Sequence, residues 1–153
     1  MTPLQDIYDA FLGKMLEDEW ENWTDEEAKL DWYSLLLAAI PRFKFPRKSL
    51  KIIDKTFFEE ELDNEEIQIL ATYMKCEWLN RSILTWENVK PLYEERDFSQ
   101  ANLLDKLNAT LLTEKENAKE LEGTYYRSRK GKPFDFTKLA GKWNGAKNKR
   151  GLW

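Results

Sequence analysis

The strongest helix signal lies in residues 63–83, which read DNEEIQILATYMKCEWLNRSI. Asp63 is a residue type favoured at a helix N-cap, and the apolar positions after it recur every three or four residues. An apolar arc this wide predicts a helix at the centre of the core. One face carries Ile67, Leu70, Ala71, Met74 and Trp78, and Ile69, Tyr73, Cys76 and Ile83 flank it.

Two shorter helices are predicted before this one. Thr2 can cap the first, with Pro3 at the first helical position, where its missing N–H costs nothing. Residues 24–27, TDEE, form a capping-box pattern that starts the second, and Pro41 ends it. The apolar positions are Leu4, Ile7, Tyr8, Phe11, Leu12 and Met15 in the first helix, and Ala28, Trp32, Leu35, Leu36, Ala39 and Ile40 in the second.

Residues 41–58 lose the helical period. They contain Pro41 and Pro46, and polar and apolar residues alternate over residues 42–45. This pattern is compatible with a loop or with a short β-hairpin.

Two more helices are predicted towards the C-terminus. Thr85 can start a short one through Val89, Leu92 and Tyr93, and a turn at residues 96–99 then caps a long helix from Gln100. Its apolar positions follow 3–4 spacing, and Glu114 alone is out of place. They are Leu104, Leu107, Leu111, Ala118 and Leu121. The predicted fold class is therefore all-α, a small helical bundle with a long C-terminal helix and an extended C-terminal arm.

The charge of the chain is divided between its two parts. Residues 1–122 contain 15 Lys and Arg against 27 Asp and Glu, a net charge of −12. Residues 123–153 contain nine Lys and Arg against Asp135 alone, a net charge of +8. The sequence thus predicts an acidic helical domain over 1–122 and, over 123–153, a basic aromatic segment that we call the arm.

The chemistry that most enzymes need is missing from the sequence. The chain has no histidine, the commonest general base and metal ligand. Its one cysteine, Cys76, lies in an apolar helical pattern and is expected in the core. There is no P-loop and no dinucleotide fingerprint. We therefore predict no catalytic, cofactor or metal site, and neither a secretion signal nor a membrane span, since the longest apolar run is residues 35–40.

Two sequence features leave alternatives open. Acidic residues cluster at 17–21 and at 59–66, where they could hold Mg²⁺ or simply occupy solvated faces and helix starts. The second explanation is favoured, and an Mg²⁺ enzyme is the weakest of the functional readings. Trp20 and Trp23, next to the first cluster, could be interface anchors or could fold back into the core.

The arm combines basic and aromatic residues, which three explanations fit. Such interleaving suits single-stranded nucleic acid, since cations neutralise phosphates and aromatic rings stack on bases. It equally suits docking on an acidic protein groove, and a disordered solubilising tail is the third possibility. The candidate anchors are Tyr125, Tyr126, Arg127, Arg129, Lys130, Phe134, Phe136, Trp143 and Trp153.

Residues 62–79 and 97–107 together resemble a pattern found in virion proteins of the tailed-bacteriophage neck. They comprise LDNEEIQILA, continuing to Met74 and Glu77-Trp78-Leu79, and then DFSQANLLDKL. The resemblance is to head-tail connector, or adaptor, proteins and covers residues 60–126. Residues 1–59 and the arm show no corresponding pattern.

The resemblance implies a helical subunit that assembles into a ring, commonly twelvefold, under the phage portal protein. The C-terminal extension would grip the portal or a neighbouring copy, and the opposite face would meet the next neck or tail protein. The expected location is the virion, with DNA passing through an acidic channel without specific binding. The alternative to a connector function is that of an accessory protein that binds nucleic acid through the arm.

Overall fold

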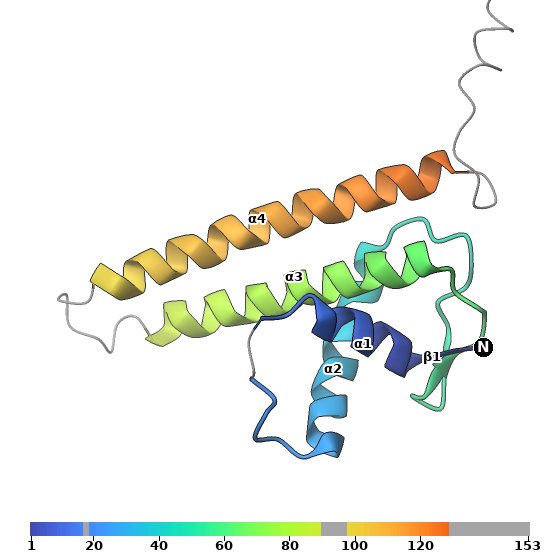
Figure 1. Cartoon of the computed structure of the whole chain (residues 1–153), viewed down its shortest axis with the longest axis horizontal. Helices are drawn as coiled ribbons and strands as arrows, with labels where there is room; N and C mark the ends of the chain where they lie inside the picture. Colours follow the sequence, from blue (N-terminus) through green and yellow to red (C-terminus); the bar gives the residue numbers. More distant parts are fainter. Residues whose placement is uncertain (17–18, 90–97, 129–153) are drawn as a thin grey trace, which may run out of the picture. The chain divides into compact units, whose positions relative to one another are not determined.

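The structure is a computed structural model that describes residues 1–16, 19–89 and 98–128 of the 153. These residues form four α-helices, one 3-10 turn and a three-stranded sheet of two-residue strands (Figure 1). The chain divides into two compact units, Met1–Glu122 and Gly123–Trp153. The predicted all-α bundle with a long C-terminal helix is confirmed.

Helix α1 spans Leu4–Gly13 and buries Leu4, Ile7, Tyr8 and Phe11. The helix was predicted correctly, but its cap was not. Pro3 is the N-cap, and Thr2 belongs to strand β1, Thr2–Pro3. The Thr2 hydroxyl donates to the Glu60 carbonyl at 3.3 Å and accepts the Leu62 N–H at 2.7 Å. Thr2 is thus bonded to the chain that leads into α3 and is unavailable to cap α1.

Helix α2 spans Asp25–Ala39, and its predicted capping box is confirmed. The Glu27 N–H donates to the Thr24 hydroxyl at 3.3 Å, and the Thr24 N–H donates to the Glu27 carboxylate at 3.1 Å. Because proline cannot continue the backbone ladder, the helix gives way to the 3-10 turn η1, Ile40–Arg42.

The hairpin alternative for residues 41–58 is confirmed, although the alternating residues 42–45 do not form it. Strands β2, Ile52–Ile53, and β3, Phe57–Phe58, pair antiparallel, and β1 pairs with the other side of β3. Phe43 is instead buried after η1, and Phe45 is 71% exposed. The turn between β2 and β3 holds two residues with left-handed backbone, Asp54 at φ 50° and Lys55 at φ 56°.

Helix α3, Asn64–Val89, is the centre of the core, as predicted. It packs against both α1 and α2. It also runs past Thr85, where the sequence predicted a new helix. The Thr85 hydroxyl donates to the Arg81 carbonyl of the same helix at 2.9 Å and caps nothing. Leu92 and Tyr93, predicted in that short helix, lie outside the described residues.

Helix α4 spans Phe98–Arg127, starting two residues before the predicted position, and up to Glu122 it runs antiparallel beside α3 (Figure 1). Leu111 and Ala118 are buried, and Leu104 and Leu107 are half-buried. Glu114, out of place in the apolar pattern, accepts a hydrogen bond from Lys75 of α3 at 2.9 Å. The interruption in the stripe is therefore an ion pair between two helices.

Candidate partner-binding surfaces

The structure describes three of the nine predicted arm anchors. Within the second unit, Tyr125 is buried, whereas Tyr126 is 41% exposed and Arg127 is exposed. The two tyrosine rings meet edge to face, with centroids 5.6 Å apart, and the Arg127 guanidinium donates to the Gly123 carbonyl. Tyr126 and Arg127 are therefore surface groups. The other six anchors, Arg129, Lys130, Phe134, Phe136, Trp143 and Trp153, lie outside the described residues.

The two tryptophans near the first acidic cluster have different environments. Trp20 is buried and packs edge-on against Phe11 and Trp32, with ring centroids 5.7 and 6.1 Å away. Its indole N–H donates to the Asp31 carboxylate at 2.7 Å. Trp20 is therefore a core residue. Trp23 is 42% exposed and remains a candidate for a contact surface.

Cys76 is a core residue, as the sequence indicated. It is fully buried in α3, and burial raises the pKa of its thiol to about 11. A thiol in this state is a poor nucleophile at neutral pH, because the thiolate is the reactive form.

The acidic cluster at 59–66 contains one buried member, Glu66. Its carboxylate accepts the Asp63 N–H at 3.4 Å and lies 3.5 Å from the Lys48 ammonium, while its second oxygen has no hydrogen-bond partner. Burial raises the pKa of Glu66, although the Asp63 N–H and the charge of Lys48 act in the opposite direction. Within the described ranges, no three Asp, Glu or Cys side chains form a group that could hold a metal ion.

A first groove lies between α3 and the first half of α4, with a volume of about 690 Å³. Trp78, Trp86, Leu103 and Leu107 form its apolar walls, and Arg81 carries its positive charge. Arg81 is already paired with Asp31, at 2.5 Å, and lies 3.9 Å from Glu19. Its charge is thus neutralised within the molecule, so this groove offers mainly an apolar surface.

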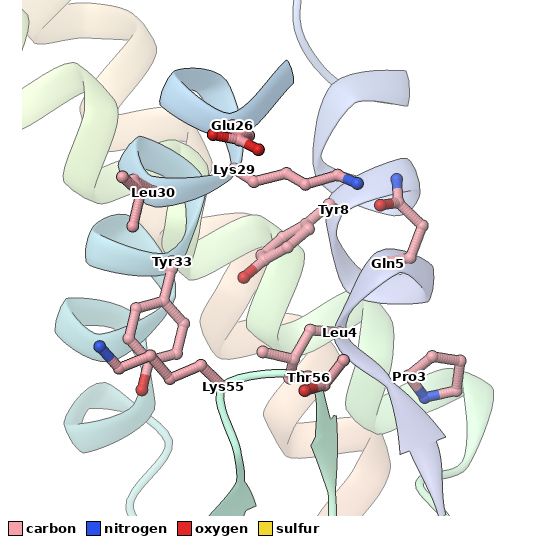
Figure 2. A pocket seen from close by; sticks show the side chains of 10 residues that line it. All are labelled: Pro3, Leu4, Gln5, Tyr8, Glu26, Lys29, Leu30, Tyr33, Lys55 and Thr56. Carbon is pink, nitrogen blue, oxygen red and sulfur yellow. The ribbon is translucent and has the colours of Figure 1, made fainter. Parts of the chain in front are cut away.

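A second groove, which we call the α1–α2 groove, has a volume of about 540 Å³ (Figure 2). Leu4 and Tyr8 from α1 face Leu30 and Tyr33 from α2. The β2–β3 turn closes one end with Lys55 and Thr56. The remaining lining residues are Pro3, Gln5, Glu26 and Lys29.

The polar groups of the α1–α2 groove sit on an apolar floor. Lys29 extends from α2 towards α1, and the Lys55 ammonium lies 6.0 Å from the centre of the Tyr33 ring (Figure 2). Burial, with a smaller contribution from Tyr33, raises the pKa of Tyr8 to about 12. Tyr8 is therefore neutral at physiological pH, and the two lysines supply positive charge.

Comparison with protein-family models, curated proteins and solved structures finds no match to this chain. Among residues 1–16, 19–89 and 98–128, no helix combines the length and apolar character needed to cross a membrane.

Proposed function

We propose that this chain is a structural assembly protein, an adaptor subunit of a tailed-bacteriophage neck that joins the portal to the next neck or tail component. The observation that carries the proposal is the course of α4. This 30-residue helix continues without a break from the acidic unit, past Gly123, to Arg127 in the basic one. Tyr126 and Arg127, two of the candidate anchors, lie exposed in the last turn of this helix.

Exposed leucines on the first unit also favour a role in assembly. On α4, Leu112 is 61% exposed, whereas its neighbour Leu111 is buried. Leu103 and Leu121 are 38% and 36% exposed. A helix that is apolar beyond the face its own chain covers can pack against a neighbouring subunit.

In the proposed assembly the arm binds a partner and the body forms a ring. The charge of +8 on residues 123–153 steers the arm towards acidic surfaces, and its aromatic rings fill pockets there. The charge of −12 on residues 1–122 would keep DNA from adhering to a channel built from the bodies.

The test is affinity capture of the tagged full-length chain from a nuclease-treated lysate of phage-infected cells. Three versions are compared: the natural chain, Phe134→Ser/Phe136→Ser/Trp143→Ser, and Arg129→Gln/Lys130→Gln. The natural chain should recover the portal protein, and the aromatic variant should lose it. The charge variant should bind the portal more slowly, and its loss of affinity at equilibrium should be smaller than that of the aromatic variant.

Two results would contradict the proposal. If the portal is not recovered at all, the neck function is wrong. If recovered proteins disappear on nuclease treatment, and the purified chain binds a DNA oligonucleotide with steep salt dependence, the arm is a nucleic-acid-binding segment.

A further inference from the structure

The α1–α2 groove has an electrostatic character opposite to that of the unit in which it lies. That unit carries a net charge of −12, yet two lysines and one carboxylate, Glu26, line the groove. Neither Lys29 nor Lys55 forms an ion pair within the part of the chain that the structure describes. The groove therefore presents two ammonium groups that no carboxylate of the described chain neutralises.

The backbone of Lys55 adds a second, independent observation. The Thr56 N–H donates to the Ile53 carbonyl at 3.0 Å, and both central residues have positive φ, which defines a type I′ turn. Glycine is strongly favoured at the second central position, because a side chain there costs free energy. A strained residue often marks a functional position, and this turn places a lysine at the end of the groove.

The groove has room for a leucine-sized side chain, since its volume is about 540 Å³. Leu30 is 64% exposed and lines the groove together with Tyr33 of the same helix, and the Tyr8 side chain lies between the two helices (Figure 2). A complementary ligand would therefore carry an apolar side chain with carboxylates next to it.

This chain contains such a segment. Leu16 is 94% exposed, the highest exposure among the large apolar side chains that the structure describes. Glu17 and Asp18 follow it directly in the sequence. The basic arm is a poor occupant by comparison, because its lysines and arginines would be repelled by Lys29 and Lys55.

We propose that the α1–α2 groove of one copy binds the segment around Leu16 of a second copy. The Leu16 side chain occupies the apolar floor between Tyr8 and Leu30, and the carboxylates of Glu17 and Asp18 pair with Lys29 and Lys55. Because groove and segment are different surfaces, the contact is head-to-tail, and repeating it generates a ring or an open filament. The inference deepens the proposed function, since it names a contact between neighbouring subunits of the ring.

A charge exchange between two full-length versions of the chain tests the contact. Version A carries Lys29→Glu and Lys55→Glu, and version B carries Glu17→Lys and Asp18→Lys. In either version alone, groove and segment have like charge, so each should sediment as a monomer at concentrations where the natural chain associates. In a mixture, each groove meets a segment of opposite charge, so association should return. All four substituted side chains are exposed or lie outside the described residues, and circular dichroism checks that both versions remain folded.

The same contact can be measured without assembly as the binding of a peptide to the full-length chain. The peptide corresponds to residues 13–19 and is acetylated and amidated at its ends. It should bind the natural chain saturably, and version A at least about tenfold more weakly. The Leu16→Ser peptide should bind neither the natural chain nor version A. No binding of the natural peptide, equal binding to version A, or a mixture of A and B that stays monomeric would each overturn the inference. These measurements need neither portal nor DNA, so their failure is distinct from failure of the neck function.

Discussion

The carboxylate of Asp31 on α2 accepts two hydrogen bonds from the guanidinium of Arg81 on α3, at 2.5 and 3.0 Å. The Trp20 indole donates to the same carboxylate at 2.7 Å. One side chain thus connects both helices to the segment that precedes α2. The Asp31 side chain is only 13% exposed, so its charge depends on these partners rather than on water.

The pH dependence of stability should report this cluster. Burial alone would raise the pKa of Asp31, but the hydrogen bonds from Arg81 and Trp20, together with the charge of Arg81, hold the pKa below its ordinary value. A lowered folded-state pKa stabilises the protein above the unfolded value of about 3.9, and this contribution is lost as pH falls through the folded value. Asp31→Asn should therefore lower the free energy of unfolding by about 1–2 kcal/mol at pH 7 and by less at pH 3.

Urea denaturation of the Asp31→Asn variant across this pH range is the measurement. Glu21→Gln, at an exposed position, is the matched control and should have little effect. An equal loss at pH 7 and pH 3 would show that the Asp31 charge is not what stabilises the cluster.

Two threonines that the sequence marked as helix starts should behave differently. Thr24→Ala removes the capping box of α2 and should cost about 1 kcal/mol. Thr85→Ala removes only an exposed hydroxyl bonded within α3, and alanine is the better helix former, so stability should stay the same or rise slightly. Thermal unfolding of both variants provides the comparison, and similar destabilisation would mean that Thr85 does cap a helix.

Replacing Glu66 should stabilise the protein at neutral pH. Its pKa is raised by burial, so the folded state binds more protons than the unfolded state between the unfolded value, about 4.3, and the raised folded value. The free energy of unfolding therefore falls as pH rises through this interval. Glu66→Gln has no charge to bury, and should be more stable than the natural chain at pH 8 by on the order of 1 kcal/mol.

The advantage of Glu66→Gln should disappear near pH 4, where the natural side chain is protonated too. Urea denaturation at pH 8 and pH 4 measures the difference in free energy of unfolding between the variant and the natural chain. Glu65→Gln, at an exposed position, is the control. A variant that is less stable than the natural chain at pH 8 would mean that the ion pair with Lys48 outweighs the burial of the charge.

The β2–β3 turn should gain stability from glycine at position 55. Lys55→Gly relieves a left-handed backbone conformation and should raise the free energy of unfolding by about 1 kcal/mol. Lys55→Ala keeps the Cβ atom and should bring no gain, which makes it the control. If both variants are equally stable, the turn is not strained at Lys55.

Much of the fold could be predicted because its signals are local. The capping box at Thr24 and Glu27 involves residues three apart, and the wide apolar arc of residues 63–83 follows from helix geometry alone. The two wrong helix starts have different causes. Thr2 bonds to Glu60 and Leu62, which are distant in sequence, instead of capping α1, whereas Thr85 bonds to Arg81 within α3, which runs past it. The interruption at Glu114 could not be explained from the sequence, because its partner Lys75 lies 39 positions away.

The sequence by itself determined the helical class, the central position of α3 and the division of charge between residues 1–122 and the arm, because periodicity and composition are properties of consecutive residues. Only the tertiary structure decided that Trp20 is buried beside Asp31 and that Lys29 and Lys55 line one groove, where no carboxylate among the described residues pairs with them. Lys29 and Lys55 lie 26 positions apart in the sequence, and no local pattern specifies that α2 and the β2–β3 turn meet. Their proximity follows from two sets of contacts. Strand β3 pairs with β1, and the Leu4 N–H donates to the Thr56 carbonyl at 2.9 Å, so the turn lies beside the start of α1. Both α1 and α2 pack against α3, which places the N-terminal half of α2 opposite the start of α1.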